Sequence, residues 1–353
     1  MTFEQRKAAF NILGDFLTVF TSENKTQDIP FFKDFQVQLE AQITLAQQHN
    51  AWFSNDHVMF ALKQWGLALS QSNLDQWLDQ YPQLTNTPDS NKTVAVIMAG
   101  NIPLVGFHDA LSVLLCGHKL IAKHSSNDQL LLPLLIKYLE TIEPKFKGKT
   151  QFTNEKLSHF DAVIATGSNN TARYFEHYFG KYPNIIRKNR NSVAVLTGNE
   201  TAQELEALSE DIFRYYGLGC RNVSKLFVPK GYNFEAFFKA IFSWQDIINH
   251  AKYANNYDYN KAVYLMSEFK LLENGFLMLK KDTSYASPIA TLFYEEYNSK
   301  EELLKHIKAD KDQVQCVLSK GFINDEIIFG KSQYPNLWDY ADGEDTISFL
   351  TKI

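Results

Sequence analysis

The sequence contains little cysteine and no long hydrophobic run. Its three cysteines, Cys116, Cys220 and Cys316, form no CxxC pair in 353 residues. So few cysteines exclude a disulfide framework, and their odd number leaves at least one thiol outside any pairing. The longest strongly apolar run, 130–136, contains a proline and is far shorter than the about 20 residues of a membrane helix. With no signal-peptide core at the N-terminus, we expect a cytoplasmic protein without a membrane span.

Neither sign of charge dominates the chain. Lys and Arg together number 35, Asp and Glu number 40, and the net charge is −5. Without a basic excess, neither nucleic acid nor an anionic membrane is an expected partner. The nine histidines include no HExxH, so no metal is expected, and GxGxxG, GxSxG and Walker A motifs are also absent. Helix N-termini and one or two lysines can nevertheless bind a phosphate-bearing small molecule.

Residues 1–88 carry apolar side chains at the spacing of amphipathic helices. The first stripe contains Phe10, Leu13, Phe16, Leu17 and Phe20. The polar stretch TNTPDSNK (85–92) then predicts a linker. We expect these helices to pack on the domain that follows, and a role in binding a partner or an acyl chain is the alternative.

After residue 90, short apolar runs alternate with helical stretches. Apolar runs lie at 93–100, 119–123, 161–167 and 192–198, with helices predicted at 105–116, 127–143 and 169–179. This alternation indicates a parallel sheet with crossover helices, in which ligands bind at the carboxyl ends of the strands. The loops there, AGNIP, KHSSND and TGSNN, are small and polar, so we expect a nucleotide at this edge.

A second α/β segment is predicted after residue 190. It comprises a helix at 200–215, the loop GLGCRN (217–222), a strand at 224–229, helices near 233–243 and 258–269, and strands at 276–280, 289–294 and 314–318. The predicted fold class is therefore α/β, with two domains whose sheets are rich in parallel strands. The predicted domains are a helical segment, 1–88, packed on a cofactor-binding domain, 89–190, and a catalytic domain, 191–353.

The three cysteines differ in their surroundings. Cys116 and Cys316 lie within apolar periodic runs and are predicted to be core residues. Cys220 lies in a glycine-bearing loop beside Arg221, and an adjacent cation in a polar loop favours the nucleophilic thiolate. A catalytic role for Cys220 and an incidental one both remain open on this ground alone. His108 and Asp109 could transfer a proton, although a structural role in the first turn of a helix is the simpler reading.

Four segments in order resemble the aldehyde dehydrogenase superfamily. AGNIPLVGFHDALSVLLCGHKLIAKHSS (99–126) resembles the Asn-x-Pro loop, helix and strand ending in Lys-Pro-Ser-Glu, and ATGS (165–168) resembles the Phe-Thr-Gly-Ser turn. KNRNSVAVL (188–196) is similar to the Gly-Gly-Lys-Asn-Pro strand, and GLGCRNVSKLFV (217–228) to the nucleophile segment. Within the superfamily the chain most resembles the acyl-CoA reductases of the bacterial bioluminescence type, the LuxC family, to which LWDYADGEDTISFL near the C-terminus is also similar.

The resemblance implies roles for individual residues. It implies Cys220 as the nucleophile and Asn101 as a side-chain donor to the oxyanion. For a nicotinamide cofactor it implies Lys123, with the neighbouring Ser125 and Ser126, along the ribose, and Gly167 and Ser168 beside the phosphates. Acyl transfer to sulfur needs this combination of a thiolate and donors aimed at the developing oxyanion, for which the backbone N–H of Cys220 is a second candidate.

Two departures from the superfamily pattern refine the expected reaction. The glutamate base of enzymes that oxidise aldehydes aligns with Ile186, which cannot activate water, so a thioester on Cys220 would resist hydrolysis. The carboxylate that holds the cofactor ribose aligns with Ser126, and a serine near Lys123 tolerates a 2′-phosphate. We therefore expect NADPH, with NADH as the alternative. The glutamate that binds the nicotinamide ribose has no counterpart near SYASPI (284–289).

These features together predict a reductase that converts a fatty acyl-CoA or another acyl thioester to the aldehyde through an acyl-cysteine. The alternatives are a cysteine-dependent acyltransferase or thioesterase without redox chemistry, an aldehyde dehydrogenase working in the oxidative direction, and a non-catalytic partner protein that keeps the fold. An acyl-transfer partner protein is compatible with this reading. The acyl chain length and the oligomeric state are not predicted.

Overall fold

The protein, seen here as a computed structural model, consists of two compact units. The structure describes residues 1–23, 28–86, 92–324 and 326–353. The first unit comprises Met1–Lys188 and Asn336–Ile353, and the second comprises Asn189–Pro335. Residues 87–91, which include most of the predicted linker and the predicted boundary at 88/89, lie outside the described part.

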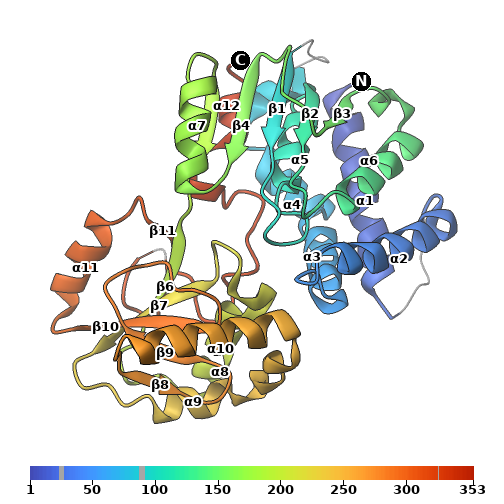
Figure 1. Cartoon of the computed structure of the whole chain (residues 1–353). Coiled ribbons are helices and arrows are strands. Elements are labelled where there is room, and N and C mark those ends of the chain that lie inside the picture. Colours follow the sequence, from blue (N-terminus) through green and yellow to red (C-terminus); the bar gives the residue numbers. More distant parts are fainter. Residues whose placement is uncertain (24–27, 87–91, 325) are drawn as a thin grey trace. The chain divides into compact units, whose positions relative to one another are not determined.

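Four helices open the first unit (Figure 1). They are α1 (Phe3–Thr21), α2 (Phe32–His49), α3 (Asn55–Ala68) and α4 (Gln71–Leu78), followed by the 3-10 turn η1 (Pro82–Asn86). The stripe predicted for α1 is buried, and a capping box between Thr2 and Gln5 satisfies its first turn. Gly14 and Gly66 let α1 approach α3 and the residues after it, because an added Cβ would lie 2.6 Å from Leu69 Cβ and 2.7 Å from Thr18 Oγ1, respectively.

The first sheet is entirely parallel in the order β3-β2-β1-β4-β5. Its strands are β1 (Thr93–Ile97), β2 (Lys119–Lys123), β3 (Thr150–Thr153), β4 (Ala162–Thr166) and β5 (Asn184–Arg187). The crossovers contain α5 (Phe107–Leu115), α6 (Leu131–Ile142) with the turn η2 (Pro144–Phe146), and α7 (Asn169–Phe179). Right-handed crossovers place α5 and α6 on one face and α7 on the other, because the chain runs outward from β1 in both directions. Figure 1 shows α7 beside β4.

The last residues of the chain return to the first unit. They form the turn η5 (Ala341–Gly343) and the helix α12 (Thr346–Leu350). Trp77 Nε1 donates to Tyr340 Oη at 2.7 Å, and Tyr81 Oη donates to Asp345 Oδ2 at 2.9 Å. The sequence analysis instead assigned everything after residue 191 to one domain. The difference arises because this segment packs its apolar side chains on the N-terminal helices and α5, which are distant in sequence.

The second unit contains a six-stranded sheet in the order β11-β6-β7-β10-β9-β8. Its strands are β6 (Asn191–Val195), β7 (Val223–Pro229), β8 (Leu271–Glu273), β9 (Met278–Lys281), β10 (Thr291–Tyr297) and β11 (Val314–Leu318). All neighbouring strands are parallel except β8 and β9. The helical elements are α8 (Ala202–Phe213), η3 (Arg214–Gly217), α9 (Glu235–Ala240), η4 (Ile241–Asn249), α10 (Ala251–Met266) and α11 (Lys300–Ala309).

The predicted fold class, two α/β domains with parallel-rich sheets after a helical N-terminal segment, is confirmed. Several predicted boundaries agree closely with the structure, including those of β2, β7, α7 and β11. The strands β3, β5 and β8 were not predicted. In the described part of the chain, no helix is long and apolar enough to span a membrane.

Candidate functional site

The loop that carries Cys220 has an unusual backbone. It follows α8, and three consecutive residues, Tyr215, Tyr216 and Gly217, have φ values of 55°, 57° and 76°. Only glycine adopts this left-handed region without a steric cost, so two successive tyrosines there store strain. The Tyr216 ring stacks on His250 with centroids 4.3 Å apart, which helps to hold this conformation. Such strained turns often present functional groups, and here the turn leads directly to Cys220.

Asn222 fastens the cysteine loop to the end of α8. Its buried side-chain amide donates to the carbonyl oxygens of Asp211 and Arg214, at 3.0 and 2.8 Å. Its Oδ1 accepts a hydrogen bond from the Gly219 N–H at 2.8 Å. One side chain therefore satisfies carbonyl groups at the helix terminus and closes the turn around Cys220. The sequence analysis did not identify this residue, although its place in GLGCRN was a signal.

Cys220 itself is exposed and lies three residues before the central strand β7. Its carbonyl oxygen accepts a hydrogen bond of 2.9 Å from the hydroxyl of Ser192, which is completely buried on β6. Ser224, on β7, donates to the carbonyl oxygen of Tyr285 at 2.7 Å. The nucleophile candidate thus has an accessible thiol on a backbone held by the sheet.

Two charged side chains attach residues 330–332 to the same loop. Arg221 Nε donates to the carbonyl oxygen of Ser332, and the Asp211 carboxylate accepts from the N–H groups of Gly330 and Ser332. Burial raises the pKa of Asp211 to about 6, although these amide donors oppose the shift. Arg221, which the sequence analysis noted as a cation beside Cys220, therefore also binds a backbone carbonyl group. The sequence analysis did not identify Asp211.

The other two cysteines are core residues, as predicted. Cys116 and Cys316 are both buried, and neither is in a disulfide. Burial raises the pKa of the Cys116 thiol to about 12. The exposed Cys220 is therefore the cysteine that a substrate can reach.

Asn101, the predicted oxyanion donor, and the residues predicted to bind a cofactor lie in the first unit, at the carboxyl ends of neighbouring strands. Asn101 follows β1, Lys123 ends β2, and Gly167 and Ser168 follow β4. The chain runs outward from β1 to β2 and β3 on one side and then returns to β4 on the other, so β1 and β4 flank the switch point of the sheet. In open parallel sheets this is the crevice where ligands bind.

Close packing brings the loops after β1 and β2 together. A Cβ on Gly100 would lie 2.4 Å from Ser125 Oγ, so only glycine fits there. Ser125 Oγ accepts a hydrogen bond from the Asn127 N–H at 3.2 Å. Lys123 Nζ donates to the carbonyl oxygen of Glu155 at 2.8 Å, and the side chain of Ser126 is exposed.

The turn after β4 begins a helix. Ser168 is the N-cap of α7, and its Oγ accepts a hydrogen bond from the Thr171 N–H at 3.3 Å. Gly167 packs closely against α7, because an added Cβ would lie 3.0 Å from the Phe175 ring. Ser168 and the first residues of α7 are exposed, so the N-terminus of this helix is accessible, a feature that suits phosphate groups.

His108 and Asp109 have structural partners within the first unit. His108 contacts the carbonyl oxygen of Leu337 through Nε2 at 2.8 Å, and burial lowers its pKa. Asp109 pairs with the guanidinium of Arg187. These contacts support a structural role for His108 and Asp109 over proton transfer. Their partners, Leu337 and Arg187, are distant in sequence, whereas the sequence analysis expected a role within the first turn of the helix. In the described part of the chain, no group of three or more His, Cys, Asp or Glu residues could hold a metal ion.

The profile of the acyl-CoA reductase (LuxC) family matches residues 8–243, more than half of the chain. The chain belongs to this family. The LuxC-family resemblance predicted from the motifs is thereby confirmed. A curated relative, the long-chain acyl-protein thioester reductase of Photorhabdus laumondii, is 21% identical over 222 residues. That alignment covers 58% of this LuxC-family chain and 46% of the relative, so the chain spans about half the length of the curated relative that it matches.

Solved structures show that this LuxC-family chain has the aldehyde dehydrogenase fold. Aldehyde dehydrogenase 21 of Physcomitrella patens, in complex with succinate, matches with a TM-score of 0.69 at 12% identity, covering 100% of this chain and 84% of that one. The indole-3-acetaldehyde dehydrogenase AldA of P. syringae, in complex with NAD+, matches with a TM-score of 0.59 at 12% identity, covering 90% and 75%. The predicted aldehyde dehydrogenase-like fold is therefore confirmed.

Proposed function

We propose that the protein reduces a fatty acyl thioester to the aldehyde through a thioester on Cys220, with a reduced nicotinamide dinucleotide as the hydride donor. The observation that carries the proposal is the exposed thiol of Cys220 on a strained, well-anchored loop in a LuxC-family chain. In this proposal residues 89–190 contribute the cofactor-binding domain, and residues from 191 onward contribute the nucleophile.

The chemistry begins at the Cys220 sulfur. As a thiolate it attacks the acyl carbonyl, the tetrahedral oxyanion collapses, and the thiol of the substrate leaves. The side-chain amide of Asn101 and the backbone N–H of Cys220 are the proposed donors to that oxyanion. Loss of one such donor typically raises the barrier by about 2.7–4 kcal/mol. After reduction of the thioester, the resulting thiohemiacetal releases the aldehyde and regenerates the Cys220 thiolate.

Position 186 supports reduction over hydrolysis. Ile186 lies on β5, where the superfamily pattern has the glutamate that activates water. A hydrocarbon side chain can neither accept a proton nor orient a water molecule. The thioester on Cys220 therefore lives long enough to be reduced. Thioesterase activity and sustained oxidation of aldehyde to acid are both disfavoured.

The residues at the strand ends fit a nicotinamide dinucleotide. Gly100 lets the loops after β1 and β2 pack closely, and the N-terminus of α7, which follows Gly167, offers backbone N–H groups to a pyrophosphate. The ammonium of Lys123 and the hydroxyls of Ser125 and Ser126 would hold the ribose side, with Ser168 at the phosphates. When bound, the cofactor supplies the hydride. Because Ser126 replaces a carboxylate, we propose NADPH over NADH, although the P. syringae relative was solved with NAD+.

The acyl donor is proposed to be acyl-CoA or an acyl group carried by a protein. The name of the P. laumondii relative specifies a long-chain acyl-protein thioester, which favours a long chain and admits an acyl-transfer partner. The two donors share the thioester carbonyl on which Cys220 acts.

Single-turnover labelling tests this function. The protein is incubated with a long-chain acyl-CoA that is radiolabelled in its acyl group, first without and then with NADPH. We expect label on the peptide containing Cys220, followed by loss of this label and appearance of fatty aldehyde when NADPH is added. Cys220→Ala should abolish both, while Cys316→Ala, which removes a buried thiol of the same unit, should retain them.

Other products would overturn the proposal. Release of fatty acid, or transfer of the acyl group without consumption of NADPH, would identify a thioesterase or an acyltransferase. A protein that neither acquires label nor consumes NADPH with acyl-CoA of intermediate or long chain would be a non-catalytic partner.

A further inference from the structure

A cavity of about 290 Å³ lies in the first unit, beside the strand ends just described. It is formed over β2 and β3 and by the connection that leads from β3 to β4. This connection contains no helix, whereas the crossovers after β1, β2 and β4 contain α5, α6 and α7. Without a helix to cover the sheet, the face shared with α7 remains partly open, which explains the cavity.

The alternation of side chains along β2 and β3 determines which residues line the floor of the cavity. Side chains of alternate residues on a strand share a face, so Lys119 and Ile121 of β2 lie together with Gln151 and Thr153 of β3. The opposite wall is formed by residues 155–159 of the connection, including Leu157. The cavity therefore has a small apolar surface surrounded by hydroxyl, amide and charged groups.

The charges in the cavity are mostly positive. Three lysines, Lys119, Lys149 and Lys156, line it, and Glu155 is the single carboxylate among the lining residues. Among the described residues, the side chains of Lys119, Lys156 and His159 form no ion pair or hydrogen bond. Cations that outnumber the carboxylates of a concave site raise the local concentration of anions. Lysine is a common phosphate-binding residue because its ammonium acts as a compact point charge.

We propose that this cavity binds a nucleotide through a phosphomonoester group. Its volume of about 290 Å³ lies at the lower end of the range for small-molecule pockets, about 300–1,000 Å³. A volume of this size suits a mononucleotide and not a whole dinucleotide. Ile121 and Leu157 provide an apolar surface for a base, and the lysines provide charge for a dianionic phosphate.

The cavity adjoins the residues proposed for the reaction, because Lys123 Nζ donates to the carbonyl oxygen of Glu155, which lines the cavity. From there it extends toward the opposite edge of the sheet. Lys119 precedes Lys123 by four residues on β2, which corresponds to about 13 Å along a strand. The cations at 119 and 149 stand where strands begin, whereas the cofactor is proposed to bind where strands end. The inference therefore adds a phosphate subsite beside the proposed cofactor site, and binding measured without turnover tests it separately from the proposed reaction.

Direct binding without turnover tests the site. Calorimetric titrations of the full chain with 3′,5′-ADP, 2′,5′-ADP, 5′-AMP and inorganic phosphate distinguish the possible sources of the phosphomonoester. Tighter binding of 3′,5′-ADP would identify the phosphorylated end of coenzyme A, and tighter binding of 2′,5′-ADP that of NADPH. We expect the preferred bisphosphate to bind at least tenfold more weakly to the double variant Lys119→Ala/Lys156→Ala.

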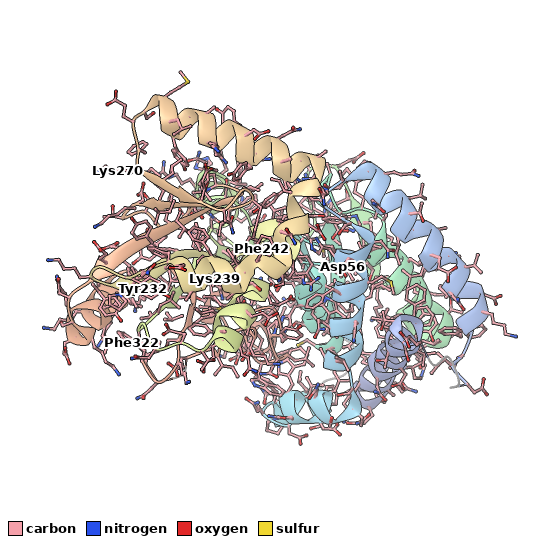
Figure 2. All side chains as sticks on the ribbon, turned by 90° about the horizontal axis from the view of Figure 1, so that it is seen from below. Asp56, Tyr232, Lys239, Phe242, Lys270 and Phe322 are labelled. Atoms are coloured by element: carbon pink, nitrogen blue, oxygen red, sulfur yellow. The ribbon has the colours of Figure 1, made fainter. Side chains whose placement is uncertain are left out.

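The control removes the same charge elsewhere. Lys239 and Lys270 are exposed at the surface of the second unit (Figure 2), and Lys239→Ala/Lys270→Ala should leave the affinity unchanged. As a second measurement that needs no variant, the bound bisphosphate should protect Lys119 and Lys156 from acetylation, read by mass spectrometry. Equal affinity of wild type and the Lys119/Lys156 variant, or equal affinity for inorganic phosphate and both bisphosphates, would overturn the proposal.

Discussion

Asp109 and Arg187 form an almost completely buried ion pair, with 2.6 Å between Arg187 Nη1 and Asp109 Oδ2. Arg187 Nη2 also donates to Thr346 Oγ1 at 3.0 Å, so the pair links α5, β5 and the C-terminal helix α12. The three elements are far apart in sequence, and two charges that attract each other inside the first unit hold them at one point.

Removal of one partner of this pair should destabilise the protein strongly. Asp109→Asn leaves the buried guanidinium of Arg187 without a counter-charge, and such a loss costs about 3–5 kcal/mol. Urea unfolding followed by circular dichroism measures the change. The control Glu235→Gln breaks the solvent-exposed pair with Lys239 and should have a much smaller effect. Equal effects of the two substitutions would contradict the role assigned to Asp109.

The backbone of the cysteine loop should depend on Gly217. Gly217 and Gly231 have nearly the same left-handed φ, 76° and 75°, so alanine at either position strains the backbone by about 1–2 kcal/mol. Only at position 217 would the added Cβ also crowd backbone, at 3.3 Å from the Ile212 carbonyl oxygen. We expect Gly217→Ala to change the alkylation rate of Cys220 and Gly231→Ala to leave it unchanged. The same rate in both variants would argue against a positioned loop.

The three cysteines should differ sharply in reactivity. In the folded protein at neutral pH, N-ethylmaleimide should modify Cys220 at least about tenfold faster than Cys116 or Cys316, because only Cys220 is exposed. The raised pKa of Cys116 slows its reaction further. Peptide mass spectrometry over a time course measures the three rates. In urea the rates should converge, and rapid labelling of Cys116 without denaturant would contradict the structure.

Acid should weaken the attachment of the C-terminal segment. His118 contacts the carbonyl oxygen of Leu350 through Nε2 at 2.9 Å, and burial lowers its pKa below 6.5. Below about pH 6.5 the unfolded state therefore binds more protons than the folded state, and stability falls as the pH falls. Buried Asp128 and Asp211, with pKa values raised to about 6, act in the opposite direction, because the folded state takes up their protons first.

Comparison with a variant separates these contributions. His118→Gln keeps a donor for the Leu350 carbonyl oxygen but does not titrate. The stability lost between pH 7.5 and 5.5, measured by urea unfolding, should be smaller in the variant than in wild type. An identical loss in both proteins would show that His118 is not the group responsible.

Much of the fold could be predicted from local patterns. The strands β2 and β7 and the helix α7 have strongly apolar or amphipathic sequences of the right length, and their observed bounds match the prediction closely. In contrast, β3 and β5 have only four residues each, and their sequences, TQFT and NIIR, carry weak strand signals. They become strands because a neighbouring parallel strand offers its hydrogen-bonding edge, a condition that no local pattern encodes.

The candidate site also contains a residue that local sequence indicated and residues that it did not. Cys220 was proposed as the nucleophile from its loop and from the resemblance to a family, because reactive cysteines occur in recognisable local settings. The residues that hold it, Ser192, Asp211 and Asn222, could not be identified in this way. Each acts by a hydrogen bond whose partner lies between 8 and 121 residues away in the chain.

The sequence by itself determined the class of fold and the family and led to the proposal of Cys220 as nucleophile, because these depend on residue type and on short-range order. Only the tertiary structure decided that the final eighteen residues, 336–353, belong to the first unit, and that an uncovered face of its sheet forms a basic cavity. Both outcomes result from packing and charge among segments distant in sequence. Burial of the Asp109–Arg187 pair and of the C-terminal apolar side chains holds residues 336–353 on the first unit. The helix-free connection between β3 and β4 leaves the cavity open.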